Sequence, residues 1–438
     1  MVVSIIEKVY SFLWGDWIKI PLPGGGSLGI SLLIILLIPT GIYFTIRTKF
    51  LQIRLFPDMV RALVAKKEHK DSLSTFQTLI VSTATRVGMG NLVGVVAAVS
   101  AGGAGAVFWM WITALIGSAT AFIEATLAQL HKEKDPLYGG YRGGPAYYIH
   151  HFFEEKSGKK KKHVLVAVAA LIVFRKNATV KVLDMIVPIM AVCYFFITLF
   201  IIIVNFRSIP GVFGRIFEEA FGIRQVVSGG FGAVLMNGVK RGLFSNEAGS
   251  GSAPCAAAAA ECDNPVRAGL TQALGVFIDT IIICSCTAMI MLIAPEKIIE
   301  GKAGMDLLQS TMQYHLGRFG VIFIALTLFL FSFSTFLGIL FYARSNVAYL
   351  FGDKWIWQTL YKIVALIMLF IGGIATYTFV WDLGDVGIGL MTIFNIGMLY
   401  LMGGQALKAL SEYEKEKKTE RDSNQNPAAG IIFFEEEK

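Results

Sequence analysis

The fold of this chain is decided by residues 238–254, which read GVKRGLFSNEAGSGSAP. The stretch follows an apolar run, yet it contains four glycines, a proline and the charged residue Glu247. Glycine and proline interrupt a helix, and a charge at membrane depth is costly, so this composition does not form a continuous lipid-facing helix. Irregular backbone inside a membrane is tolerated only where it packs against protein or lines a cavity. The stretch therefore predicts a helix that breaks beside a buried site.

A second stretch, residues 82–94, has the same character and reads STATRVGMGNLVG. Its three glycines weaken a helix, and Arg86 and Asn91 add polar groups to it. Unwound backbone offers N–H groups that can hold a carboxylate and carbonyl groups that can coordinate Na⁺. A glycine face for close helix packing remains the alternative for this stretch. Two interrupted helices in corresponding halves of a chain are the sequence sign of a secondary transporter.

The composition of the whole chain agrees with a membrane protein. Its 438 residues are 55% apolar and 16% charged, with a mean hydropathy of +0.62, whereas soluble proteins are about 45–50% apolar and about 25% charged. This excludes a soluble multidomain enzyme and a disordered chain. The net charge of +8 comes from basic residues in short loops, which favours membrane orientation over binding to nucleic acid. The five cysteines form no CxxC pair, so neither a disulfide nor a metal-thiolate site is predicted.

A helix needs about 20 apolar residues to cross the hydrocarbon core, and nine segments are candidates. They are Leu28–Ile46, Gln77–Ser100, Ala106–Leu130, Met185–Phe206, Val226–Ser245, Val266–Ile293, Phe319–Leu350, Ile363–Trp381 and Val386–Leu407. We therefore predict an all-α polytopic membrane protein with an extracytoplasmic segment (1–27), a transmembrane domain (28–407) and a charged cytoplasmic tail (408–438). Ile5–Ile20 is expected to be a helix at the membrane surface, and the tail is expected to be disordered beyond Thr419.

Basic loops set the orientation, because lysine and arginine accumulate on the cytoplasmic side of a membrane. The loop Arg47–Lys70 contains seven of them, which places the N-terminus outside and the C-terminus in the cytoplasm. The segment Val164–Phe174 has eleven apolar residues and basic residues on both sides. It is too short to span, and both of its ends are predicted to be cytoplasmic.

Five motifs are specific enough to compare with known families. They are GMGN at Gly88–Asn91, RGLFSNEAGSGSAP at Arg241–Pro254, DNPVRAGL at Asp263–Leu270, GVFIDT at Gly275–Thr280 and YGGYRGGPAYYI at Tyr138–Ile149. Together they resemble the alanine/glycine:cation symporter family of the amino acid–polyamine–cation superfamily. The resemblance implies a LeuT-type inverted-repeat bundle of two five-helix repeats with broken first and sixth helices. It also implies Na⁺-coupled uptake of alanine or glycine across the inner or plasma membrane, without an organic cofactor.

The resemblance assigns roles to the matched positions. The substrate-binding residues that it implies are Met89, Gly90, Asn91, Phe244, Ser245, Asn246 and Ile339. Of these, the backbone N–H groups of residues 89 and 90 would hold the substrate carboxylate, and residues 244–246 would line the pocket. The Na⁺ ligands that it implies are the carbonyls of Ala84 and Val87 and the hydroxyls of Ser334 and Thr335. Without the resemblance, a Ser-Thr pair in a membrane helix more often donates to a carbonyl of its own helix.

The chain also departs from the family pattern. Met89 and Ile339 stand where the family usually has threonine and tryptophan, Arg344 where it has glutamate, and Phe394 where proline is common. About 40 residues, enough for two helices, are missing after Phe174. Two of the core helices of the LeuT-type bundle are therefore expected to be absent.

The sequence-based prediction is Na⁺-coupled symport of a small neutral amino acid by alternating access, with the lipid bilayer as the other partner and no prediction of the oligomeric state. An internally deleted relative that no longer transports is one alternative. A proton-coupled symporter is another, because Glu247 and Asp279 are carboxylates within predicted spans. Arg86 is expected either to pair with one of these carboxylates or to reach an aqueous vestibule. An enzyme is not expected, since the chain has no HExxH motif and no P-loop.

Overall fold

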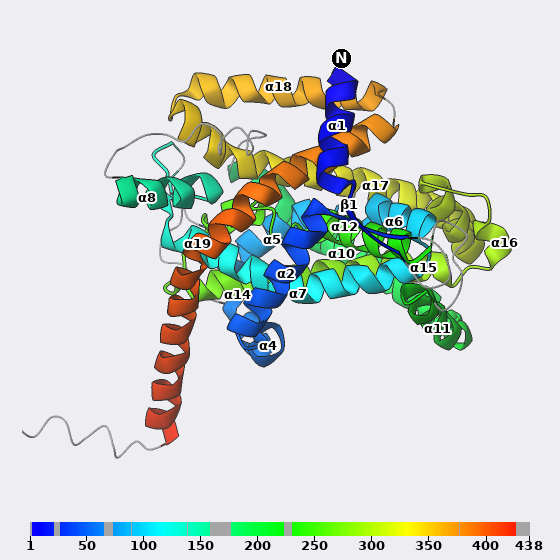
Figure 1. Ribbon diagram of the computed structural model, residues 1–438, viewed down its shortest axis with the longest axis horizontal. Coiled ribbons are helices and arrows are strands. Elements are labelled where there is room, and N and C mark those ends of the chain that lie inside the picture. The colour runs from blue at the N-terminus through cyan, green and yellow to red at the C-terminus, as the bar shows by residue number, and fades with distance from the viewer. Residues whose placement is uncertain are drawn as a thin grey trace, which may run out of the picture.

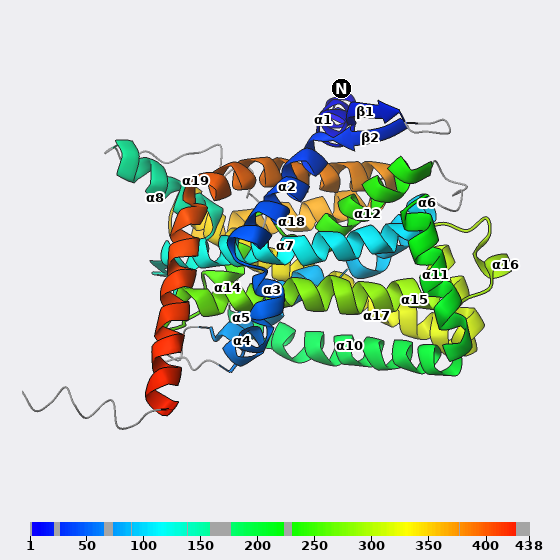
Figure 2. The same cartoon turned by 60° about the horizontal axis from the view of Figure 1, so that its bottom comes forward.

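The computed structural model describes residues 2–21, 27–64, 73–88, 90–137, 139–157, 177–222, 230–375 and 377–425. Long helices lie side by side in a bundle, with helix α1 and a short hairpin at one edge (Figures 1 and 2). The helices up to residue 157 are α1 (Val2–Trp14), α2 (Leu32–Arg47), α3 (Leu51–Arg54), α4 (Phe56–Ala62), α5 (Thr75–Arg86), α6 (Val95–Gly102), α7 (Gly105–Leu130) and α8 (Pro145–Ser157). The later helices are α10 (Asn177–Val204), α11 (Ile209–Ala220), α12 (Gly230–Asn246), α13 (Ala253–Ala257), α14 (Pro265–Val276), α15 (Ser285–Leu292), α16 (Glu296–Ile299), α17 (Met305–Phe351), α18 (Trp355–Ile374) and α19 (Tyr377–Gln425).

Shorter elements connect or interrupt these helices. Residues Gly90–Gly94 (η1) and Phe277–Cys284 (η3) are π-helical, and Phe206–Ser208 (η2) is a 3₁₀ turn. Two antiparallel hairpins pair β1 (Asp16–Pro21) with β2 (Ser27–Ser31) and β3 (Glu133–Lys134) with β4 (Tyr141–Arg142). The described part of the chain is therefore mostly helical, in line with the predicted all-α class, and two short hairpins that were not predicted add to it.

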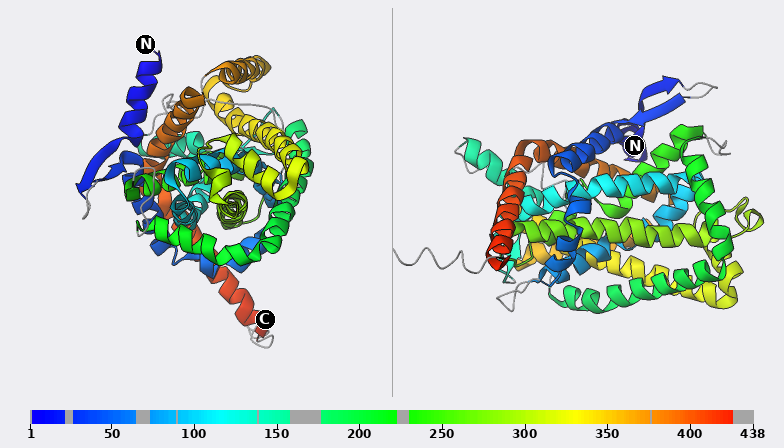
Figure 3. Two further views of the ribbon diagram at one scale, coloured as in Figure 1. Left: turned by 90° about the vertical axis from the view of Figure 1, so that its right-hand side faces the viewer. Right: turned by 90° about the horizontal axis from the view of Figure 1, so that it is seen from below.

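Helix α7 lies inside the bundle and packs against α2, α11, α12 and α14. Figure 3 shows the surrounding helices end-on and from below. The sequence explains the close packing, because Gly117, Ser118 and Ala119 are small and buried, and small residues let helix backbones approach. A Cβ added to Gly117 would lie 3.0 Å from the Ala248 side chain. Apolar side chains form two large cores, one around α5, α6, α10 and α15 and one around α4, α14 and the second half of α7.

Each predicted span overlaps a helix, but within the described ranges fewer than nine helices are long enough to span. Among the described residues, six helices are long and apolar enough to cross a membrane, and the bent pair formed by α5 with η1 and α6 makes a seventh. The predicted spans Leu28–Ile46 and Val226–Ser245 correspond to α2 and α12, which have 16 and 17 residues. The first is shortened because residues 27–31 pair as strand β2 instead of extending the helix.

Three predicted boundaries were wrong. The span Ile363–Trp381 straddles two helices, because the apolar run continues across Ala375, whose backbone is extended between α18 and α19. Ile5–Ile20 is not one helix, because α1 ends at Trp14 and residues 16–21 form strand β1, which pairs with β2. The tail is not disordered directly beyond Thr419, because α19 continues to Gln425.

The segment Val164–Phe174 lies outside the described residues. Its expected failure to cross the membrane stays a prediction.

Candidate functional site

The first predicted break is present between α5 and η1. Helix α5 ends at Arg86, and the bent pair turns by 48°. The Gly88 N–H donates to the Arg86 carbonyl oxygen at 2.8 Å and to Asn91 Oδ1 at 3.1 Å. In an unbroken helix the same N–H would donate to the carbonyl oxygen of Ala84, four residues earlier. The break therefore releases the Ala84 carbonyl, one of the predicted Na⁺ ligands, for another partner.

The predicted hydroxyl ligands lie on α17, directly against this break. Thr335 Oγ1 occupies the position beside Gly88 that an added Cβ would fill. This oxygen is buried and has no hydrogen-bond partner among the described residues. Ser334 behaves differently, because its hydroxyl donates to the Phe331 carbonyl oxygen at 3.0 Å. The hydrogen bond to a carbonyl of the same helix is therefore made by Ser334 and not by Thr335, whose oxygen remains available to a ligand.

The second predicted break is present after α12. The helix ends at Asn246, and Glu247 has a φ of 55°, a left-handed conformation that is uncommon for a residue with a side chain. Two serine hydroxyls hold the turn: Ser250 donates to the Glu247 carbonyl oxygen at 2.7 Å, and Ser252 donates to its carboxylate at 2.6 Å. Asn246 Oδ1 accepts from the Ala248 N–H at 3.0 Å, while its Nδ2 is buried without a hydrogen-bond partner in the described structure.

The two breaks meet each other and share one carboxylate. A Cβ added to Gly90 would lie 3.1 Å from Ser245 Cα, so glycine permits the close approach. Asp279, in η3, accepts from Asn91 Nδ2 at 2.8 Å and from the Ser245 hydroxyl at 2.8 Å. Asp279 is fully buried, and Thr280 also donates to it. The Asn91 and Ser245 side chains are therefore used to join the breaks rather than left free to face a ligand.

That Asp279 joins the two breaks was not predicted from the sequence. The signal for it was present, since an acidic residue in an apolar segment needs a partner inside the protein. What the sequence did not give was the partner, because Asn91 is 188 residues away along the chain.

Arg86 is not placed as predicted. The residue is 1% exposed, so its guanidinium does not reach an aqueous vestibule. Its Nη1 donates to the Gln272 carbonyl and side-chain oxygens at 3.4 and 3.3 Å. Nε and Nη2 have no hydrogen-bond partner in the described part of the chain, so the predicted ion pair with Glu247 or Asp279 is not formed there. Packing of the guanidinium against Gly275 on α14 explains this position.

The remaining predicted residues are placed as follows. The Phe244 ring lies 5.0 Å from the Trp381 ring, between centroids, on the side of the site where α19 begins. Ile339 is 37% exposed on α17 and contributes less to an enclosed wall than the predicted role requires. Val87 is the C-cap residue that follows α5, and it is fully buried. Met89 lies outside the described residues, so its role stays a prediction.

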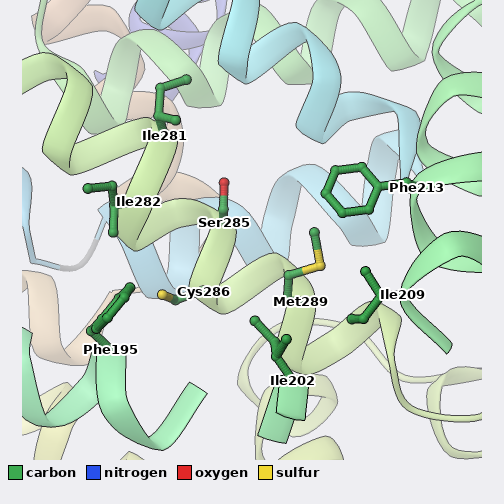
Figure 4. Close-up of a pocket in the computed structure, with 9 residues that line it drawn as sticks. All are labelled: Phe195, Ile202, Ile209, Phe213, Ile281, Ile282, Ser285, Cys286 and Met289. Carbon is green, nitrogen blue, oxygen red and sulfur yellow. The ribbon is translucent and has the colours of Figure 1, made fainter. Parts of the chain in front are cut away.

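An apolar pocket of about 320 Å³ lies elsewhere, between α10, α11, η3 and α15 (Figure 4). Its lining residues are Phe195, Ile202, Ile209, Phe213, Ile281, Ile282, Ser285, Cys286 and Met289. The polar side-chain oxygen among them, Ser285 Oγ, accepts from Trp111 Nε1 at 2.8 Å. A zwitterionic ligand needs polar partners at both ends, so this pocket does not compete with the two breaks as a substrate site.

Comparison with known proteins agrees with the geometry. The profile of the sodium:alanine symporter family matches residues 25–160 and 160–427. A probable sodium/glutamine symporter of Bacillus subtilis is 39% identical over 431 residues, which cover 90% of this chain and 90% of the relative. A sodium/alanine symporter of Methanococcus maripaludis is 33% identical over 469 residues, covering 95% and 98%. A sodium/proton-dependent alanine carrier protein of a Bacillus species is 33% identical over 418 residues, covering 84% and 94%.

Both the profile and these relatives cover most of the chain, and the resemblance seen in its motifs is confirmed. The chain is a polytopic membrane transporter rather than an enzyme, and it belongs to the sodium:alanine symporter family.

Proposed function

We propose that this protein couples the entry of Na⁺ to the uptake of a small neutral amino acid, alanine or glycine. The observation that carries the proposal is the buried, unpartnered Thr335 hydroxyl set against a helix break that releases the Ala84 carbonyl. Neutral oxygens of this kind suit a hard monovalent cation that must bind reversibly. The proposed Na⁺ ligands are these two groups, the Val87 carbonyl and the Ser334 hydroxyl.

The proposed substrate site lies on the other side of the same break. The backbone N–H groups of Met89 and Gly90 would receive the substrate carboxylate, because Gly90 begins η1 and the first N–H groups of a helix lack partners within that helix. Asn246 Nδ2 is a buried donor without a described partner, and it would add a hydrogen bond to the substrate. The relatives include both a glutamine symporter and an alanine symporter. The choice of alanine or glycine as the substrate therefore rests on the motif resemblance and not on the relatives alone.

Coupling follows from the geometry. A cation that binds to α5 and α17 together orders the break at Gly88, and the same break presents the N–H groups that bind the substrate. Each ligand therefore favours the conformation that the other needs. We also propose a LeuT-type inverted repeat, with the N-terminal segment outside and the tail in the cytoplasm, as the framework in which this site alternates.

The test is uptake of labelled L-alanine into proteoliposomes with an inward Na⁺ gradient. Concentrative uptake with Na⁺ and none with choline supports the proposal. Equal uptake in both salts, with dependence on an inward proton gradient, would support proton coupling instead. One of the relatives is a sodium/proton-dependent alanine carrier protein. Labelled glycine and glutamine in competition with alanine would rank the substrates.

A second candidate function is that of an internally deleted relative that binds without transporting. The family profile matches in two stretches that meet at residue 160, close to the short segment Val164–Phe174. The alignment to the Bacillus subtilis relative extends over 431 residues while covering only 90% of this chain, which supports missing positions within it. We propose that two core helices are absent from this region. Insertion of the corresponding segment of a full-length relative should then restore or raise uptake, and equal uptake with and without the insert would refute the deletion as a cause of impairment.

A further inference from the structure

A second charged cluster is buried where α12, α19 and the N-terminal helix α1 meet. Lys240 and Arg241 expose 6% and 7% of their surface, and Asp385 of α19 is fully buried. Arg241 donates to both carboxylate oxygens of Asp385, at 3.2 Å each, and Lys240 Nζ lies 2.6 Å from one of them. Charges removed from water in this way are stable only while the set is complete, because each would otherwise be buried alone.

Helix α1 completes the cluster from outside the predicted transmembrane domain. Trp14 Nε1 donates to the Asp385 backbone carbonyl oxygen at 3.1 Å. Lys240 Nζ donates to the Tyr10 hydroxyl at 2.5 Å and lies over the Tyr10 and Trp14 rings, 4.4 and 5.4 Å from their centroids. Aromatic faces stabilise a partly desolvated ammonium group in this geometry. Figure 1 shows α1 beside α12 and the first part of α19.

The cluster connects directly to the substrate site. The Arg241 guanidinium lies 4.2 Å from the centroid of the Trp381 ring, and that ring packs against Phe244. Arg241 precedes Phe244 by three residues, which is slightly less than one helical turn. The charged cluster therefore covers the site on the side of the bundle that carries α1, with one layer of aromatic rings between them.

We propose that Lys240, Arg241 and Asp385 form the gate on this side of the substrate site, and that α1 is the clasp that holds the gate shut. Opening separates α19 from α12 and lets water rehydrate the three charges. Hydration of the three charges then offsets the loss of their ion pairs. A purely apolar plug would have no such compensation when it opened. This inference rests on the proposed transport function, because only a transporter needs access to the site from one side at a time.

Cys284 is a native reporter for this gate. Its Sγ lies 3.1 Å from the Ser245 hydroxyl and 3.3 Å from Asn91 Nδ2, and the residue is 2% exposed. The full chain would carry serine or alanine at the other four cysteines, which are Cys193, Cys255, Cys262 and Cys286. Labelling of Cys284 by a membrane-impermeant thiol reagent, added to the face of the vesicle that carries the N-terminus, then measures how often the gate opens.

Asp385→Asn is expected to raise the labelling rate from this face by about tenfold or more, because it leaves two buried cations without their shared charge. Trp14→Phe keeps a ring but loses the hydrogen bond to Asp385, so a smaller rise in the same direction is expected. The matched control is Asp353→Asn, which breaks the ion pair with Arg142 in a different part of the molecule. Its labelling rate should equal that of the parent chain.

Equal labelling of the parent chain and of both gate variants would overturn the proposal. Faster labelling from both faces of the membrane would also overturn it, because a loosened bundle exposes Cys284 to either side. Labelling requires neither substrate nor a Na⁺ gradient. A gate can therefore be found in a chain that does not transport, and the failure of the gate is distinguished from the failure of Na⁺-coupled uptake.

Discussion

Replacing Thr335 by valine tests the proposed cation site with a small change in shape, a methyl group for a hydroxyl. The Thr335 hydroxyl is buried without a described hydrogen-bond partner. An unsatisfied buried hydroxyl costs about 1–3 kcal/mol. In choline, without Na⁺, the substitution should therefore leave the free energy of unfolding unchanged or raise it.

In Na⁺ the expectation differs, because the variant should gain less stability from the ion than the parent chain does. A ligand that binds only the folded state stabilises it by about 2.7 kcal/mol when its concentration is 100 times the Kd. If the loss of one ligand oxygen weakens Na⁺ binding by about tenfold, the same Na⁺ concentration supplies only about 1.4 kcal/mol. Thr335→Val should thus lose about half of the stabilisation by Na⁺ while keeping its stability in choline.

The assay is thermal unfolding of the purified protein in detergent, titrated with NaCl at a constant total of NaCl and choline chloride. The matched control is Thr198→Val on α10, because the Thr198 hydroxyl is also buried but donates to the Tyr194 carbonyl oxygen at 2.9 Å. It should lose about 0.5–1.5 kcal/mol in both salts and keep the full Na⁺ increment. A Thr335→Val protein that is weakened in choline and unchanged in its Na⁺ increment would refute the cation site.

Two further predictions concern the same break and the C-terminal end of α7. Gly88→Ala places a Cβ against Thr335 Oγ1, so it should remove the Na⁺-dependent rise in Tm and lower the Tm itself, by thermal unfolding in the same two salts. Near the end of α7, His131 and His151 share a contact of 3.2 Å between their Nδ1 atoms. Burial lowers the pKa of His131 from its usual 6.5, and the hydrogen bond to Glu133 raises the pKa of His151. Thermal stability should fall as the pH drops below about 6.5, because the half-buried His131 resists protonation. It should also fall as the pH rises from about 6.5 through the raised pKa of His151, because His151 loses its proton over that range; His151→Gln should remove only this alkaline loss.

Local composition predicted the two breaks, and the reason is physical. The glycines around Gly88, and the glycines and charge around Glu247, weaken a helix wherever the chain places them. The predictions therefore did not depend on knowing what the segments contact. The hydroxyls of α17 differ, because only the resemblance implied their role: Thr335 lies beside the first break as implied, whereas the Ser334 hydroxyl donates to a carbonyl of its own helix.

Long-range partners could not be predicted in this way. Arg241 and Asp385 are 144 residues apart, and nothing in either segment indicates the other. Arg86 was expected either to pair with a carboxylate or to reach an aqueous vestibule, but the packing of α5 against α14 places its guanidinium beside Gln272. Hydropathy also failed at Ala375, because a run of apolar residues does not reveal a change in backbone direction.

Binding and transport make different demands on this chain. The described site is built by α5, η1, α12, η3 and α17, and the proposed gate adds α1 and α19. None of these elements includes residue 160, where the family profile divides. Binding requires only that the two breaks and α17 meet, whereas alternating access also requires a wall of helices against which they move. If the protein gains stability from Na⁺ but accumulates no alanine, the binding site is intact, and the surrounding helices do not suffice for alternating access. If it does both, the remaining helices form an adequate wall. If it does neither, the proposed site is wrong, because its described contacts come from α5, η1, α12, η3 and α17 and not from the region in which we propose that two helices are absent.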